Sequence, residues 1–206
     1  MPTAATSRDV TSALWAEWGR ITRFLESARL ALAREEALWA SLEFRHREEI
    51  GLVAKTGGGT YKVRLGQHLE AVGDEQTLHA SMLVHSYAIA EAAAARKLGV
   101  ESRALRGIED WGGRLLRANG RGWESVTGGC AGAVEVAVLR NAFAHGTRTI
   151  DEFGERRLAK AGAPVRLAGS PVTLSYAELW TSRGRLRSLL QVSAVETQTV
   201  SCPAYD

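Results

Sequence analysis

The sequence has few cysteines, no long apolar run and no large excess of either charge, and each shortage excludes a class of protein. Its two cysteines, Cys130 and Cys202, are too few for a disulfide scaffold and lack the spacing of a zinc site. No stretch approaches the roughly 18 apolar residues that span a bilayer, so we expect no membrane segment. Residues 1–10 lack the apolar core of a secretory signal. We therefore expect a cytoplasmic protein without a structural metal or cofactor.

Composition and charge placement are compatible with an ordinary globular chain that has one basic region. Of the 206 residues, 45% are hydrophobic and 24% are charged, which excludes fibrous and wholly disordered classes. The formal net charge is only +3. Residues 1–139 carry 17 basic and 17 acidic side chains, whereas residues 140–190 carry 9 basic and 4 acidic ones. Arginine outnumbers lysine 22 to 4, and its planar fork of donors suits phosphate.

Apolar spacing and capping residues predict an all-α protein. Residues such as Leu14, Trp18 and Leu25 recur at three- and four-residue steps, which is the pattern of one helical stripe. Similar patterns, together with capping residues, predict the other helices. The expected helices cover residues 11–49, 74–98, 102–119, 130–145 and 176–192. They describe an up-and-down bundle of four to five helices with a small β-hairpin element.

Three segments interrupt or follow this pattern. We expect a glycine-rich insert at 51–73, with a short strand near 61–65 beside a flexible turn. We expect a loop over 147–174, with a hairpin around Gly169 inside 165–174. The serine of the SYAE sequence at 175–178 should form a capping box that opens the last helix. We expect a single domain over residues 1–192, followed by a flexible tail at 193–206.

Two polar features resemble functional sites, but for each of them an interpretation without a chemical role is favoured. The AKTGGGT string at 54–60 resembles a phosphate loop, yet its lysine precedes the glycines and the GxxxxGK[ST] order is absent. His85 lies on the apolar stripe of the helix predicted over 74–98. For a single histidine on such a stripe, a core residue with its hydrogen bonds satisfied is the favoured interpretation.

The most informative stretch is VEVAVLRNAFAHGT, residues 134–147. Asn141 and His145 are one helical turn apart, on the stripe defined by Val134 and Val138, and Arg140 flanks that stripe. Polar groups on a packing face need partners, and the obvious partner is a second copy of the same helix.

This stretch resembles the HEPN superfamily, whose ribonuclease motif is an arginine and a histidine separated by four to six residues. The apolar run before Leu139-Arg140-Asn141, the small residue before His145 and the glycine after it are typical of the family's fourth helix. The resemblance implies an HEPN-like helical bundle and a metal-independent endoribonuclease. In that reaction the RNA 2′-hydroxyl attacks its own 3′-phosphate and leaves a 2′,3′-cyclic phosphate.

The resemblance also implies roles for individual residues. His145 would transfer protons, because histidine changes its charge near neutral pH. Arg140 would stabilise the phosphate, and Asn141 would orient His145 or bind a phosphate oxygen. The basic surplus would hold the RNA backbone, with Arg148, Arg156 and Arg157 as the candidate RNA-binding residues.

The expected partners are RNA and a second protomer joined through the motif helix, with an antitoxin or a larger defence-system protein as a further partner. The function would then be that of a toxin or an anti-phage effector. One position departs from the family. In the branch neutralised by a nucleotidyltransferase antitoxin, a tyrosine follows the histidine by two positions, whereas this chain has Thr147.

Two alternatives remain open from the sequence. The chain could be a non-catalytic HEPN module that dimerises or docks on a partner, with Arg140 a solvated residue and His145 favoured by the helix dipole. A transcription regulator is the third interpretation, but the sequence has no helix-turn-helix with a basic recognition helix.

Overall fold

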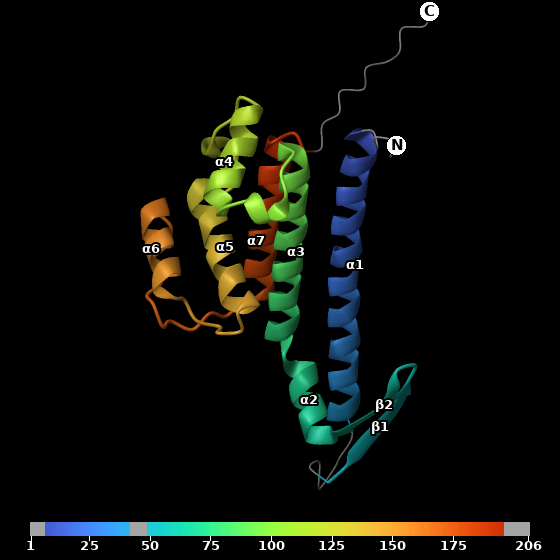
Figure 1. Ribbon diagram of the computed structural model, residues 1–206. Coiled ribbons are helices and arrows are strands. Elements are labelled where there is room, and N and C mark those ends of the chain that lie inside the picture. The colour runs from blue at the N-terminus through green and yellow to red at the C-terminus, as the bar shows by residue number, and fades with distance from the viewer. Residues whose placement is uncertain (1–6, 42–48, 196–206) are drawn as a thin grey trace, which may run out of the picture. The chain divides into compact units, whose positions relative to one another are not determined.

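The described part of the chain is predominantly helical and contains a two-stranded antiparallel sheet. A computed structural model describes residues 7–41 and 49–195, and Figure 1 shows its elements. Seven α-helices lie within these ranges, more than the four to five expected. The elements are α1 Ser7–Ala40, β1 Gly51–Thr56, β2 Gly59–Arg64, α2 Leu65–Gly73, α3 Glu75–Leu98, α4 Ile108–Ala118, α5 Gly129–Ala144, α6 Glu152–Ala161 and α7 Tyr176–Val192.

Contacts divide the described chain into two units, and α1 and α3 each contribute to both. One unit contains residues 22–41 and 49–78, which hold the sheet and α2. The other contains residues 7–21 and 79–195, which hold α4 to α7 and the predicted site.

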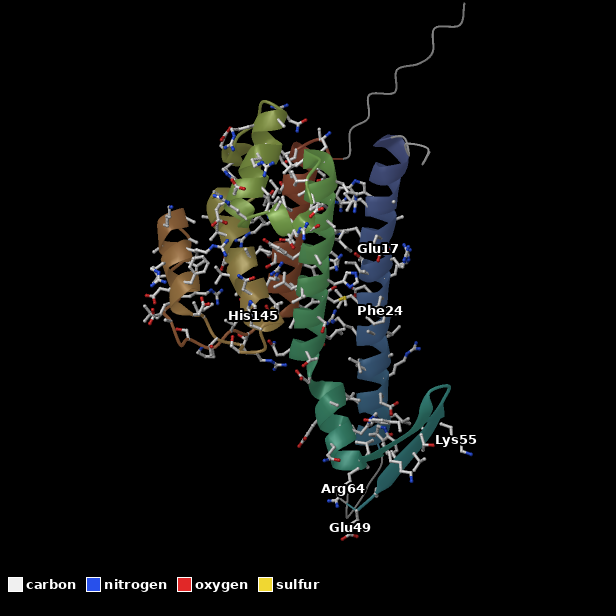
Figure 2. All side chains as sticks on the ribbon, viewed as in Figure 1. Glu17, Phe24, Glu49, Lys55, Arg64 and His145 are labelled. Carbon is white, nitrogen blue, oxygen red and sulfur yellow. The ribbon has the colours of Figure 1, made fainter. Side chains whose placement is uncertain are left out.

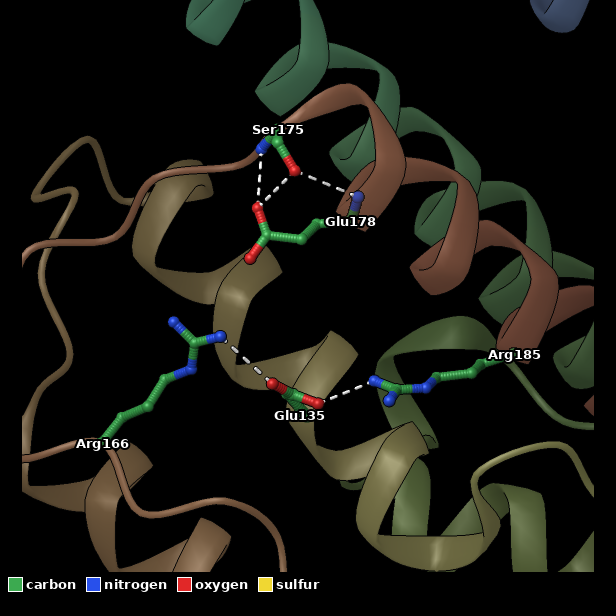
Figure 3. A network of polar contacts seen from close by, with 5 residues as sticks. All are labelled: Glu135, Arg166, Ser175, Glu178 and Arg185. Carbon is green, nitrogen blue, oxygen red and sulfur yellow. Dashed lines mark hydrogen bonds and ion pairs between the residues drawn. The ribbon is translucent and has the colours of Figure 1, made fainter.

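The predicted helices at 74–98 and 130–145 are confirmed within a residue or two. Asp74 caps α3, because its Oδ1 accepts the Thr77 amide hydrogen at 3.1 Å. Helix α1 begins earlier than expected, at Ser7, and ends at Ala40. The predicted helical residues 42–48 lie outside the described residues, as do Cys202 and most of the predicted tail. The capping box is confirmed, because Ser175 and Glu178 exchange both of its hydrogen bonds at the start of α7 (Figure 3).

Three local predictions are wrong. Residues 102–119 do not form one helix, since a 3₁₀ turn at Ser102–Ala104 is followed by extended residues, and α4 begins at Ile108. The segment 147–174 is not merely a loop, since it contains α6, which Asp151 caps through the Gly154 amide. No hairpin forms over 165–174. Instead, Pro171 pairs with Thr149 in a single antiparallel bridge that returns the chain to the end of α5.

The core histidine is His79, not His85. His79 is 1% exposed and its Nδ1 lies 2.9 Å from the Leu174 carbonyl oxygen. The His85 side chain is 51% exposed. The buried face of α3 includes Leu83, Ser86 and Tyr87, so it is rotated from the stripe that the apolar spacing indicated.

Helix α5 is the centre of its unit. Contacts with α4, α6 and α7 surround it, and every residue from Gly132 to Leu139 is buried. The one acid in that run, Glu135, lies between two arginines, with Arg185 at 2.7 Å and Arg166 at 3.2 Å (Figure 3). These ion pairs connect α5 to α7 and to the segment after α6, and they fix the helix that carries the candidate site.

Candidate functional site at the end of helix α5

The last turn of α5 carries Arg140 and Asn141, and His145 caps it. The His145 amide donates to the Asn141 carbonyl oxygen at 3.0 Å, and Gly146 follows with φ of +71°. That left-handed conformation favours glycine and ends the helix. His145 is therefore held at an exposed helix terminus rather than in a continuing helix (Figure 2).

Arg140 is held by three neighbours. Its Nη1 donates to the Asn141 Oδ1 at 3.0 Å, and its Nη2 donates to the Glu91 Oε2 at 3.1 Å. Its Cζ lies 4.3 Å from the centroid of the Tyr87 ring, so the guanidinium stacks on an aromatic face. The side chain retains 24% exposure, and two of its five donors serve these acceptors. Three donors remain for a ligand.

Tyr87 and Glu91 were missed by the sequence reasoning, although a signal was present. They lie four residues apart on α3, so they occupy the same face one turn apart. Burial, together with the negative charge of Glu91, raises the pKa of Tyr87 to about 12, against the opposing charge of Arg140. Tyr87 is thus a neutral platform under Arg140 at every physiological pH.

Asn141 and His145 line a pocket of about 340 Å³ that opens between the end of α5 and α6. Its apolar lining includes Val138, Ala142, Ile150 and Phe153, and its polar lining includes Asn141, His145, Thr147, Thr149, Asp151 and Arg157. The Phe153 side chain is largely exposed. A concave site lined by both apolar side chains and hydrogen-bonding groups is compatible with the binding of a small polar ligand or part of a larger one.

The stripe of Val134, Val138, Asn141 and His145 meets another part of its own chain. A Cβ built on Gly154 of α6 would lie 3.0 Å from the Val138 Cγ1, so α6 packs closely on this stripe. The expectation that a second copy satisfies the stripe rested on the need of Asn141 and His145 for partners on a packing face. Because α6 of the same chain packs on this face, the stripe by itself gives no reason for a second copy.

The three arginines predicted to bind RNA occupy different environments. Arg157 makes two hydrogen bonds to the Glu109 carboxylate, at 3.1 and 2.7 Å, which connect α6 to α4. Arg156 is exposed and lies 3.6 Å from Glu152 one turn earlier on α6. Arg148 is exposed and has φ of +50°, a left-handed conformation that is uncommon for arginine. Among the three, Arg157 also lines the pocket.

Glu109 is held in its charged form by these contacts. Burial raises its pKa, but the hydrogen bonds from Arg157 and from its own backbone and the charges of Arg157 and Lys160 outweigh burial, so its pKa lies below the usual 4.5. At neutral pH the ion pair between Glu109 and Arg157 therefore holds α6, which forms one wall of the pocket, against α4.

Two features that the described residues lack bear on the site. No three His, Cys, Asp or Glu side chains within residues 7–41 and 49–195 gather closely enough to hold a metal ion. None of the described helices combines the length and apolarity needed to cross a bilayer. Comparisons with protein-family models, curated protein sequences and solved structures found no match for this chain.

Proposed function

We propose that this protein is an HEPN-like endoribonuclease that cleaves RNA without a metal ion and acts as a toxin or an anti-phage effector. One observation carries the proposal. Arg140 is hydrogen-bonded to Asn141, and Asn141 lines the same pocket as the exposed His145. Asn141 thus connects Arg140, which is not among the residues that line the pocket, with the pocket that His145 lines. A cation, an amide and an imidazole are the groups that phosphodiester transesterification requires.

The proposed reaction proceeds in one displacement. Neutral His145 accepts the proton of the ribose 2′-hydroxyl, and the 2′-oxygen forms a bond to the adjacent phosphorus. The bond from phosphorus to the 5′-oxygen breaks, and that oxygen takes a proton from an imidazolium or from water. The products are a 2′,3′-cyclic phosphate and a 5′-hydroxyl. The remaining donors of Arg140 stabilise the charge that builds on the phosphorane oxygens.

Glu91 and Tyr87 are positioning residues in this proposal. Glu91 accepts from one nitrogen of Arg140, and the Tyr87 ring fixes the plane of the guanidinium. An arginine held at both its edge and its face loses less rotational freedom when it binds phosphate, which favours the transition state.

A second candidate function is favoured by the same ion pair. Glu91 offsets the charge of Arg140. A partly buried arginine with a purely structural role also requires a paired charge of this kind. In that case the chain is a non-catalytic HEPN-like module that docks on a partner protein. This alternative predicts partner binding that survives His145→Ala and no RNA cleavage by the purified protein.

The test is cleavage of a defined RNA by purified protein, analysed on denaturing gels. We expect the products to carry cyclic phosphate ends and cleavage to persist in excess EDTA. RNA with a 2′-deoxy residue at the scissile position should resist cleavage. Arg140→Ala and His145→Ala should each abolish cleavage and relieve growth arrest on expression. Cleavage at a 2′-deoxy position, or a requirement for magnesium after EDTA, would show that the mechanism is wrong. Sedimentation of the same samples tests whether a second protomer is needed.

A further inference from the structure

The antiparallel hairpin formed by β1 and β2 has two chemically different faces. The pairing places Lys55 opposite Thr60, Val53 opposite Lys62 and Gly51 opposite Arg64. Because side chains alternate along a strand, these six residues share one face. The other face carries the apolar residues Leu52, Ala54, Tyr61 and Val63.

All the charge of the hairpin is positive and lies on one of these faces. Lys55, Lys62 and Arg64 are exposed, and no acidic residue occurs between Gly51 and Arg64. The nearest acid before the hairpin in the sequence, Glu49, precedes β1. None of the three cations forms an ion pair with another described residue. Figure 2 shows the Lys55 side chain pointing away from the ribbon into open space.

The register sets the three cations in a row. Lys62 and Arg64 are two residues apart on one strand, which separates their Cα atoms by roughly 6.8 Å. Lys55 is the diagonal neighbour of Lys62 across the strands, roughly 7–8 Å away. The apolar side chain on this face, Val53, is 62% exposed, and the three cations beside it are exposed as well.

We propose that this basic face, defined by Lys55, Lys62 and Arg64, binds the phosphate backbone of single-stranded RNA. A phosphodiester strand carries a regular row of negative charges, and contacts to it need no base-specific geometry. The proposal goes beyond the site on α5, and only the choice of RNA over DNA rests on the proposed function. An anionic membrane is the poorer fit, because surface-binding segments present larger basic clusters together with apolar anchors, whereas Tyr61 lies on the opposite face.

The experiment measures binding of a fluorescent 2′-O-methyl oligonucleotide to the full chain by polarisation. This RNA lacks the attacking hydroxyl and stays intact during the measurement. The variant Lys55→Gln/Lys62→Gln/Arg64→Gln should bind about tenfold more weakly at low salt, and its log–log salt slope should fall by about 2. The charge-keeping variant Lys55→Arg/Lys62→Arg/Arg64→Lys should bind like wild type.

The matched control is Arg96→Gln/Arg106→Gln/Arg121→Gln, which removes the same three charges from exposed positions in the other unit. Circular dichroism checks that each variant is folded. If the hairpin variant binds within twofold of this control, or if the wild type binds anionic vesicles and not the oligonucleotide, the proposal is overturned. Binding that depends on the hairpin, without cleavage of unmodified RNA, would refute the proposed nuclease function and leave this inference standing.

Discussion

Replacing Arg140 by lysine separates the shape of the guanidinium from its charge. Arg140 donates to the Asn141 Oδ1 from one nitrogen and to the Glu91 Oε2 from another, while its plane stacks on Tyr87. Lysine has a single ammonium group on a flexible stem, so it cannot serve both acceptors, stack in the same way and also meet a phosphate. The variant keeps the positive charge and loses the fork.

The size of the effect follows from one lost charge-assisted hydrogen bond. Such a bond is worth about 1.5–3 kcal/mol, and each 1.36 kcal/mol is tenfold in rate, so Arg140→Lys should slow cleavage roughly 10- to 150-fold. Its free energy of unfolding should fall by less than about 1 kcal/mol, because the charge opposite Glu91 is retained. Arg140→Ala should cost more stability, about 1–2 kcal/mol, since Glu91 loses its partner but stays 27% exposed to water.

The assay pairs single-turnover cleavage of a short RNA with urea unfolding of the same protein preparations. Arg106→Lys, a change at an exposed residue away from the pocket, is the control and should match wild type in both measurements. Cleavage by Arg140→Lys within threefold of wild type would refute the reasoning, since charge alone would then suffice. A loss of cleavage that follows the loss of stability in every variant would favour the structural role of Arg140.

Three further predictions concern the scaffold and the pocket. Ser175→Ala removes the acceptor for the Glu178 amide and should lower the unfolding free energy by about 1 kcal/mol in urea titrations, whereas Ser175→Asp should not; equal losses would contradict the capping argument. The pKa of Glu109 is lowered, so the stability it contributes is present above about pH 4.5 and is lost as pH falls through its folded pKa. The stability gap between wild type and Glu109→Gln should therefore shrink between pH 6 and pH 3, and a constant gap would contradict this assignment. Phe153→Ala removes an exposed ring at the pocket and should raise the KM for RNA several-fold without a large loss of stability; an unchanged KM would exclude contact between this ring and RNA.

The helices with strong local signals could be predicted from the sequence. Asp74 before an alanine-rich run, Gly146 after the motif helix and the Ser175 capping box each fix one helix end through a backbone contact within a few residues. The apolar stripe of α1 is confirmed in the same way, because Leu14, Trp18 and Leu25 are buried. Such signals are local in the chain, so a pattern can reveal them.

The missed elements are short and polar. Helix α6 has ten residues, and only Gly154 and Leu158 of them are buried, so no apolar stripe indicated it. Its capping signals were nevertheless present in Asp151 and in Gly162, whose φ is +69°. Capping residues at both ends of a charged segment are thus a usable sign of a short helix where hydrophobic periodicity fails.

The environment of Arg140 could not be predicted, because it depends on contacts between distant parts of the chain. The spacing within one helix placed Arg140 beside Asn141. Its other neighbours, Tyr87 and Glu91, come from α3, and Glu91 lies 49 residues earlier in the chain. The same holds for Arg157. The basic surplus made it a candidate RNA-binding residue, but in the structure it donates to Glu109, which lies 48 residues earlier in the chain. A sequence motif names the groups at a site, while the fold decides which of their charges are already paired. In this chain both arginines donate two hydrogen bonds to neighbouring side chains, but the Arg140 side chain is 24% exposed and the Arg157 side chain only 12%, so a phosphate can reach the remaining donors of Arg140 more easily.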